Sequence, residues 1–183
     1  MMRWLLLALG GALLGGIVHL ATIIILPRTA TQDAYSRLAR IPVNTVTPLP
    51  APTPNAAIMP FMDPAFAAAV CRYDLSQGPL KLSLPVSLAY TSVSFYTRTD
   101  VAYYAINDRA AGKRVIELDL MTVEQHNQMP ENEEITAADR LIVESPTLTG
   151  LIAMRALAPE PGLMPMAQSS LAAAKCVRAD DNN

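Results

Sequence analysis

RVIELDL, residues 114–120, alternates apolar and acidic side chains and decides the fold class of this chain. Successive side chains of a β-strand point to opposite faces of its sheet, so the alternation predicts a half-buried strand. We expect the isoleucine and both leucines to face a core, and Glu117 and Asp119 to face solvent.

Similar segments lie on both sides of this stretch, separated by short turn sequences such as Ser76-Gln77-Gly78-Pro79. Several short strands at such spacing are typical of an antiparallel sandwich or barrel. The other predicted strands are residues 71–75, 80–84, 89–97, 101–107, 140–145 and 150–157.

Helices are predicted at three places in this part of the chain. Asp63 followed by proline indicates a helix start before the alanine-rich FAAAV, residues 66–70. Thr122 and Gln125 form a capping-box pattern. Residues 163–176 predict a helix that packs on the sheet. Its expected buried face consists of Met164, Ala167, Leu171 and Ala174.

The N-terminal stretch Trp4–Leu26 carries no formal charge, and His19 is its one titratable side chain. Its 23 residues would form a helix about 34 Å long, enough to cross a hydrocarbon core of about 30 Å. The apolar part of a cleaved signal is shorter, and Arg28 stands where signal peptidase favours a small residue. We therefore expect an uncleaved signal anchor; the alternative is a cleaved signal peptide.

Small residues gather on one face of this expected helix. Gly11 and Gly15 form a GxxxG pair, and a second row of small residues lies beside them. Because lipid offers little hydrophobic drive between helices, close backbone contact through small residues favours association. This pattern predicts docking to a membrane-protein partner, whereas the alternative is a plain anchor. The expected docking residues are Ala8, Gly11, Ala12, Gly15, Gly16 and His19.

Prolines at positions 42, 48, 50, 52, 54 and 60 predict an extended spacer after the membrane segment. The expected organisation is a transmembrane signal anchor (1–28), a proline-rich extended linker (29–62), a β-sandwich domain (63–178) and a disordered tail (179–183).

The two cysteines, Cys71 and Cys176, lie far apart, without CxxC spacing or a nearby histidine. Such a pair in an exported chain indicates a structural disulfide, which belongs in an oxidising compartment. We therefore expect an inner-membrane protein with a cytoplasmic N-terminus and a periplasmic main domain. The alternative is a cytosolic domain with two unpaired thiols.

No motif for nucleophilic, nucleotide-dependent or metal-dependent catalysis occurs, so we expect neither an enzyme nor a cofactor or metal. The net charge of −2 argues against a nucleic-acid partner. The run of acidic residues between Arg114 and Arg140 indicates a solvated face rather than a calcium loop. Four tyrosines around one predicted hairpin could line a ligand pocket or fill the core. They are Tyr90, Tyr96, Tyr103 and Tyr104.

From Tyr73 onward the chain resembles the bacterial envelope proteins that carry the domain of unknown function 1254, specifically a short membrane-anchored subtype. The resemblance implies a β-sandwich of jelly-roll type, and it implies no agreed activity or catalytic residues. It rests on YDLSQGPLKLSLP (73–85), YTSVSFYT (90–97), NDRAAGK (107–113) and RLIVESPTLTGLIAMRALAPEPG (140–162).

These observations favour a non-catalytic accessory or assembly subunit of an envelope membrane complex. The alternative is a small-ligand-binding envelope domain that uses the tyrosine-rich hairpin, and an enzyme comes third.

Overall fold

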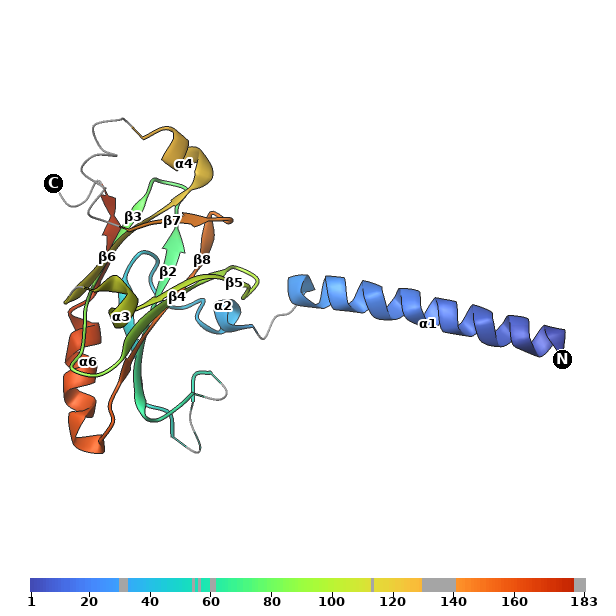
Figure 1. Ribbon diagram of the computed structural model, residues 1–183, viewed down its shortest axis with the longest axis horizontal. Helices are drawn as coiled ribbons and strands as arrows, with labels where there is room; N and C mark the ends of the chain where they lie inside the picture. Colours follow the sequence, from blue (N-terminus) through green and yellow to red (C-terminus); the bar gives the residue numbers. More distant parts are fainter. Residues whose placement is uncertain are drawn as a thin grey trace. The chain divides into compact units, whose positions relative to one another are not determined.

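The computed structural model divides the chain into two units, Met1–Asp33 and Ala34–Asn183. Figure 1 shows helix α1 in the first unit and the β-strands in the second. The structure describes residues 1–29, 33–53, 55, 57–59, 62–112, 114–129 and 141–179.

The first unit is one long helix, α1 (Met2–Thr29). Its segment Met2–Leu26 is the one helix of the described chain that is long and apolar enough to cross a membrane. None of that segment is buried, so its leucines and isoleucines are exposed. Exposing so much apolar surface to water is unfavourable in free energy, whereas exposing it to lipid is not. The helix therefore has the properties of a membrane anchor or of a signal sequence.

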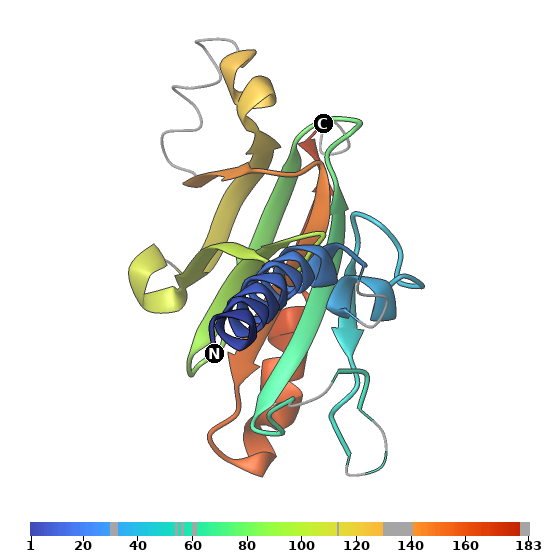
Figure 2. The same cartoon turned by 90° about the vertical axis from the view of Figure 1, so that its right-hand side faces the viewer.

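The second unit contains two β-sheets that share one core (Figure 2). The mostly β fold with an apolar N-terminal helix and a C-terminal helix is thus confirmed. The five-stranded sheet has the order β1 (Val46–Leu49), β2 (Phe66–Asp74), β8 (Thr149–Leu157), β4 (Thr91–Thr97), β5 (Ala102–Asn107). The four-stranded sheet has the order β7 (Leu141–Ser145), β6 (Val115–Thr122), β3 (Leu80–Pro85), β9 (Lys175–Arg178).

The strand pairs are antiparallel except for β6 and β7, which are parallel. This pair departs from the antiparallel arrangement expected from the sequence. Parallel neighbours need a connection of a dozen or more residues. The chain provides one between Thr122 and Leu141, which begins with helix α4 (Val123–Asn127). The predicted capping box of Thr122 and Gln125 is present at the start of α4.

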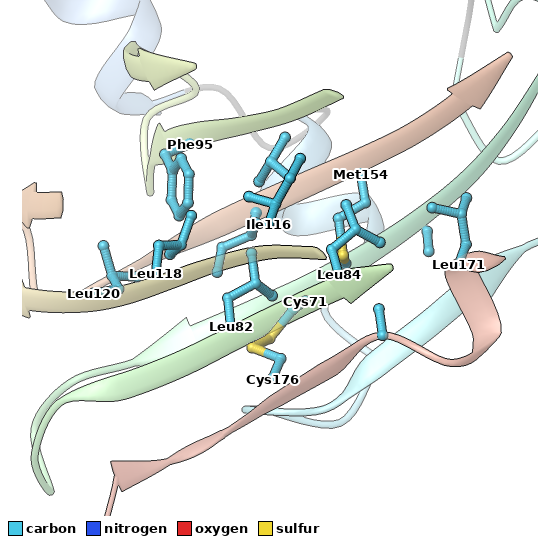
Figure 3. Close-up of a cluster of buried hydrophobic side chains, with 14 of the residues drawn as sticks. Cys71, Leu82, Leu84, Phe95, Ile116, Leu118, Leu120, Met154, Leu171 and Cys176 are labelled. Carbon is cyan, nitrogen blue, oxygen red and sulfur yellow. A yellow bond between two sulfur atoms is a disulfide. The ribbon is translucent and has the colours of Figure 1, made fainter. Parts of the chain in front are cut away.

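The core lies between the sheets and contains the apolar face of RVIELDL (Figure 3). Ile116, Leu118 and Leu120 are buried and Glu117 is exposed, as the alternation predicts. Asp119 is only 8% exposed, so its expected solvent position is wrong. The reason is that β6 is an inner strand, and Asp119 lies between Lys81 of β3 and Ile142 of β7.

Helix α6 (Met164–Ala172) covers part of this core, as predicted, and follows a short 3-10 turn, η1 (Pro161–Leu163). Its Ala167 and Leu171 are buried, and Ala174 is buried just after its end. A last short helix, α3 (Asp108–Ala111), joins β5 to β6.

The segment after α1 is not a free spacer, contrary to the expected linker over 29–62. Helix α2 (Ala34–Arg37) starts the compact unit, and β1 pairs with β2. A second apolar cluster consists of Leu38, Leu49, Val70 and Leu151. Proline is tolerated on an edge strand because the missing N–H breaks no inner ladder, which explains how Pro48 fits in β1.

FAAAV belongs to strand β2 and not to the helix predicted from its alanines. Alanine favours helices by only a few tenths of a kcal/mol per residue over most other side chains. Here β2 is hydrogen-bonded to β8 over nine residues and to β1 on its other side. This two-sided pairing outweighs the local preference.

At the C-terminus, the N–H of Ala179 donates to the carbonyl of Pro79 at 2.9 Å. The rest of the predicted disordered tail, residues 180–183, lies outside the described residues.

Candidate functional site

Cys71 and Cys176 form the predicted disulfide. Cys71 lies at the middle of β2 and Cys176 on β9, so the bond joins the two sheets through the core (Figure 3). The sequence placed Cys176 at the end of the last helix. The chain instead leaves α6 and forms the short edge strand β9, which pairs with β3.

A cluster of hydroxyl groups surrounds the buried side chain of Tyr73 on β2. The Tyr73 hydroxyl lies 3.0 Å from Ser145 Oγ and 3.3 Å from Thr147 Oγ1. It donates to the carbonyl of Tyr96 at 3.3 Å and accepts from the Tyr103 hydroxyl at 3.2 Å. The cluster therefore ties β2, β4, β5 and the β7–β8 connection together through polar groups in the interior.

Gly150 on β8 makes this cluster possible. A Cβ atom at this position would collide with the carbonyl oxygen of Tyr96 and with the phenol end of Tyr73. The glycine is required by this close approach rather than by backbone conformation. No local sequence pattern marks Tyr73 or Gly150, although both lie in the stretches that carry the family resemblance.

The four tyrosines of the predicted ligand pocket do not line one cavity. Tyr103 and Tyr104 pack on Phe95, with ring centroids 6.1 and 5.8 Å away. An irregularity in the pairing of β4 with β5 puts both neighbours on the core side. Tyr96 packs in the second apolar cluster, and only Tyr90 lines a groove on the surface.

Burial raises the pKa of Tyr103 above its ordinary range. Its hydrogen bond to Ser145 opposes this rise, and the neighbouring Tyr73 adds to it. The phenol is therefore neutral in the folded protein at physiological pH and serves as a hydrogen-bond donor rather than as a base.

The groove beside Tyr90 has a volume of about 250 Å³ and lies on the outer face of the five-stranded sheet. It is open to solvent, and polar groups supply more of its surface than apolar groups do. Its lining residues are Phe66, Tyr90, Ser92, Ser94, Ala105, Ile106, Asn107 and Arg155.

A second groove, of about 410 Å³, lies where the two sheets end near the C-terminus. Asn44 shapes its wall, because its side chain donates to the carbonyl of Asp74 and accepts from the Asp74 N–H. The remaining lining residues are Val43, Thr45, Gln77, Val177 and Arg178. The sequence contains no pattern that would have indicated either groove.

Three glycines on the small-residue face of α1 have open space beside them. A Cβ atom added at Gly11, Gly15 or Gly16 would meet no atom within 4 Å. Docking through Ala8, Gly11, Ala12, Gly15, Gly16 and His19 stays a prediction.

Most of the acidic run lies outside the described residues, including Glu131, Glu133, Glu134 and Asp139. Near it, His126 Nδ1 lies 2.7 Å from Glu144 Oε1 and links α4 to β7 at the surface. Within the described ranges, no group of three histidine, cysteine or acidic residues could hold a metal ion.

The chain matches parts of two larger solved structures. The VPA0106 protein from Vibrio parahaemolyticus matches with a TM-score of 0.60 and 12% identity, over 81% of this chain. An uncharacterized protein from Burkholderia cenocepacia matches with a TM-score of 0.44 and 12% identity, over 63% of this chain. The chain spans 35% and 32% of these two proteins, respectively. At this identity the first likeness shows the fold alone.

No curated protein matches the chain. The sequence profile of the family described as protein of unknown function (DUF1254) matches residues 43–177. This range begins just before β1 and ends within β9, so it covers both sheets. The chain therefore belongs to the DUF1254 family, as the resemblance in its sequence implies.

Proposed function

We propose that this protein is a membrane-anchored, non-catalytic accessory subunit of an envelope membrane complex, with its β-sandwich on the periplasmic side of the inner membrane. The observation that carries the proposal is the exposed apolar helix α1 joined to a disulfide-closed sandwich. A helix of this kind costs little in lipid, and a structural disulfide persists in an oxidising compartment.

The chemistry of the sandwich supports a binding role rather than catalysis. The hydroxyl cluster at Tyr73 is internal, and its groups satisfy one another. The burial that raises the pKa of Tyr103 removes it as a base. Both grooves are shallow and open, which suits recognition of a surface or small ligand better than exclusion of water.

The small-residue face of α1 gives the proposal a specific test. Gly11→Leu combined with Gly15→Leu would fill the space that close helix contact requires. We expect this double variant to separate from its complex after gentle detergent extraction, as shown on a native gel and by mass spectrometry of the co-migrating proteins. The sandwich should stay folded, because α1 forms a separate unit.

A matched control uses Gly10→Leu with Ala21→Leu. At 3.6 residues per turn these positions lie opposite the middle of the face that consists of Ala8, Gly11, Ala12, Gly15, Gly16 and His19. The control adds nearly the same bulk, one methyl group less, and should still co-migrate with the complex. Release of both variants, or of neither, would count against docking through the small-residue face. Wild-type protein that migrates alone would contradict the subunit role itself.

A further inference from the structure

The outer face of the five-stranded sheet is covered at one end and open at the other. Leu151 of β8 and Val70 of β2 belong to the second apolar cluster, against which Ala34 and Tyr35 of α2 pack. Farther along the same face, Arg155 and Ser92 point outward, because their neighbours Met154 and Val93 are buried in the main core. The groove of about 250 Å³ occupies this open end.

Strand register aligns three polar residues across this groove. Ser92 on β4 is paired with Arg155 on β8 and with Asn107 on β5. Neighbouring strands are about 4.8 Å apart, so the row spans about 10 Å. Tyr90 and Ser94 lie two residues to either side of Ser92 and share its face. The sheet thus presents one cation, an amide and three hydroxyl groups together.

The polar groups of the groove offer hydrogen-bond donors. Among the described residues, none forms a hydrogen bond or an ion pair with the Arg155 side chain, which is exposed. Asn107 Oδ1 already accepts the N–H of Ala110 at 2.9 Å, so its amide N–H groups are left for a ligand. No carboxylate lines the groove within the described chain. The nearby Asp108 accepts the N–H of Thr91.

The two aromatic residues that line the groove supply apolar contact area. Phe66 lies on β2 at one side, and Tyr90, at 36% exposed, precedes β4 at the other. A ring-shaped ligand could rest against them while a charged group reaches Arg155. A volume of about 250 Å³ has room for one such ring and is below the range typical of drug-sized ligands.

We propose that this groove binds a carboxylate carried on a sugar-sized ring, such as a uronic acid. Arg155 would hold the carboxylate through its planar guanidinium, as arginine commonly does in two parallel hydrogen bonds. Asn107, Ser92 and Ser94 would donate to the other oxygens. The site stands independently of the accessory role, because it lies wholly on the sandwich.

The test is calorimetric titration of the full-length protein in detergent with three probes. Glucuronate carries both the ring and the carboxylate, glucose lacks the carboxylate, and acetate lacks the ring. We expect glucuronate to bind and glucose not to bind, with acetate at least tenfold weaker than glucuronate. Arg155→Gln should weaken glucuronate binding tenfold or more, and Arg155→Lys should weaken it less.

Arg114→Gln is the matched control, because Arg114 is exposed and lies outside the groove. It removes the same charge and should leave the affinity for glucuronate unchanged. Absence of heat with glucuronate, equal binding of glucose, or equal loss in the Arg114 and Arg155 variants would overturn the proposal. Acetate as tight as glucuronate would also overturn it, since the ring would then contribute nothing.

Discussion

Gly150 leaves the space that the interior polar cluster around Tyr73 needs. In Gly150→Ala the new methyl group would collide with the backbone of Tyr96, which cannot move without breaking the pairing of β4 and β8. We expect the free energy of unfolding to fall by about 3 kcal/mol, at the upper end for overpacking. Urea unfolding followed by circular dichroism measures this change.

Gly162 provides the matched control for this substitution. A Cβ atom there would meet nothing within 4 Å. Gly162→Ala should therefore leave the free energy of unfolding within about 0.5 kcal/mol of wild type. Equal effects of the two alanines would show that Gly150 is not held by a close contact.

Tyr103 gives the protein a specific dependence on alkaline pH. Its pKa is raised in the folded state, so the unfolded state releases the phenol proton at a lower pH than the folded state does. The stability from this group is complete below the unfolded pKa of about 10 and is lost as pH rises above it. We expect the free energy of unfolding to decline above pH 10. The slope should correspond to about one proton that the unfolded state has released from this residue and the folded state has kept.

Tyr103→Phe tests this assignment through the slope rather than the absolute stability. The variant also loses the hydrogen bond to Tyr73, which lowers stability at every pH. Urea unfolding between pH 8 and pH 11 should show a shallower decline in the variant than in wild type. Parallel curves would mean that Tyr103 ionises equally in both states.

At the scale of elements, Arg72 adds side-chain hydrogen bonds that help hold the segment from α2 to β1 on the sheet. Arg72 Nη1 donates to the carbonyls of Ala39 and Ile41 at 2.6 and 3.2 Å. Its guanidinium also lies 4.9 Å from the centre of the Tyr35 ring. Arg72→Met removes these bonds and keeps the apolar part of the side chain. We expect about 2 kcal/mol of destabilisation and faster hydrogen exchange in residues 34–49.

Arg98→Met is the comparison for that variant. Arg98 also lies over the Tyr35 ring, at 5.7 Å. A cation–π contact at the surface contributes about 0.5–1 kcal/mol, so exchange in residues 34–49 should change much less. Similar exchange rates in both variants would show that the backbone hydrogen bonds of Arg72 do not hold the segment.

Alternation predicted the strands well where one face is buried and the other meets solvent, as in residues 91–97. It failed for strands that have a neighbouring strand on each side, because those neighbours come from distant parts of the sequence. FAAAV became a strand because β1 and β8 flank it, and Asp119 is buried because β6 is an inner strand. The strands that flank FAAAV and β6 cannot be predicted from the residues next to them in the sequence.

The candidate site was harder to predict than the strands. Tyr90, Tyr96, Tyr103 and Tyr104 are close in sequence, but the pairing irregularity in β5 and the cover by α2 send them to different surroundings. The row of Arg155, Ser92 and Asn107 depends on the register of three strands from two distant parts of the chain. Register follows from packing of the whole sandwich, so residue spacing alone could not indicate this groove.

At the scale of the whole molecule, the disulfide closes most of the sandwich into one loop. Cys71 and Cys176 are 105 residues apart, and linking them joins the two sheets. In the chain-entropy account, a loop of this length contributes about 4–5 kcal/mol. We expect Cys71→Ala combined with Cys176→Ala to lower the midpoint of thermal unfolding strongly, while dithiothreitol should not lower the midpoint of the double variant further.

Intact mass spectrometry of the protein from carbonate-washed membranes, denatured and then treated with maleimide without reductant, tests the central claim most directly. An anchored and oxidised sandwich predicts a chain in the membrane fraction that retains α1 and carries no maleimide at Cys71 or Cys176. Reduction before treatment should add two labels. A shorter chain lacking α1 in the wash fraction, or a full-length chain with two labels before reduction, would contradict a membrane-anchored protein in an oxidising compartment.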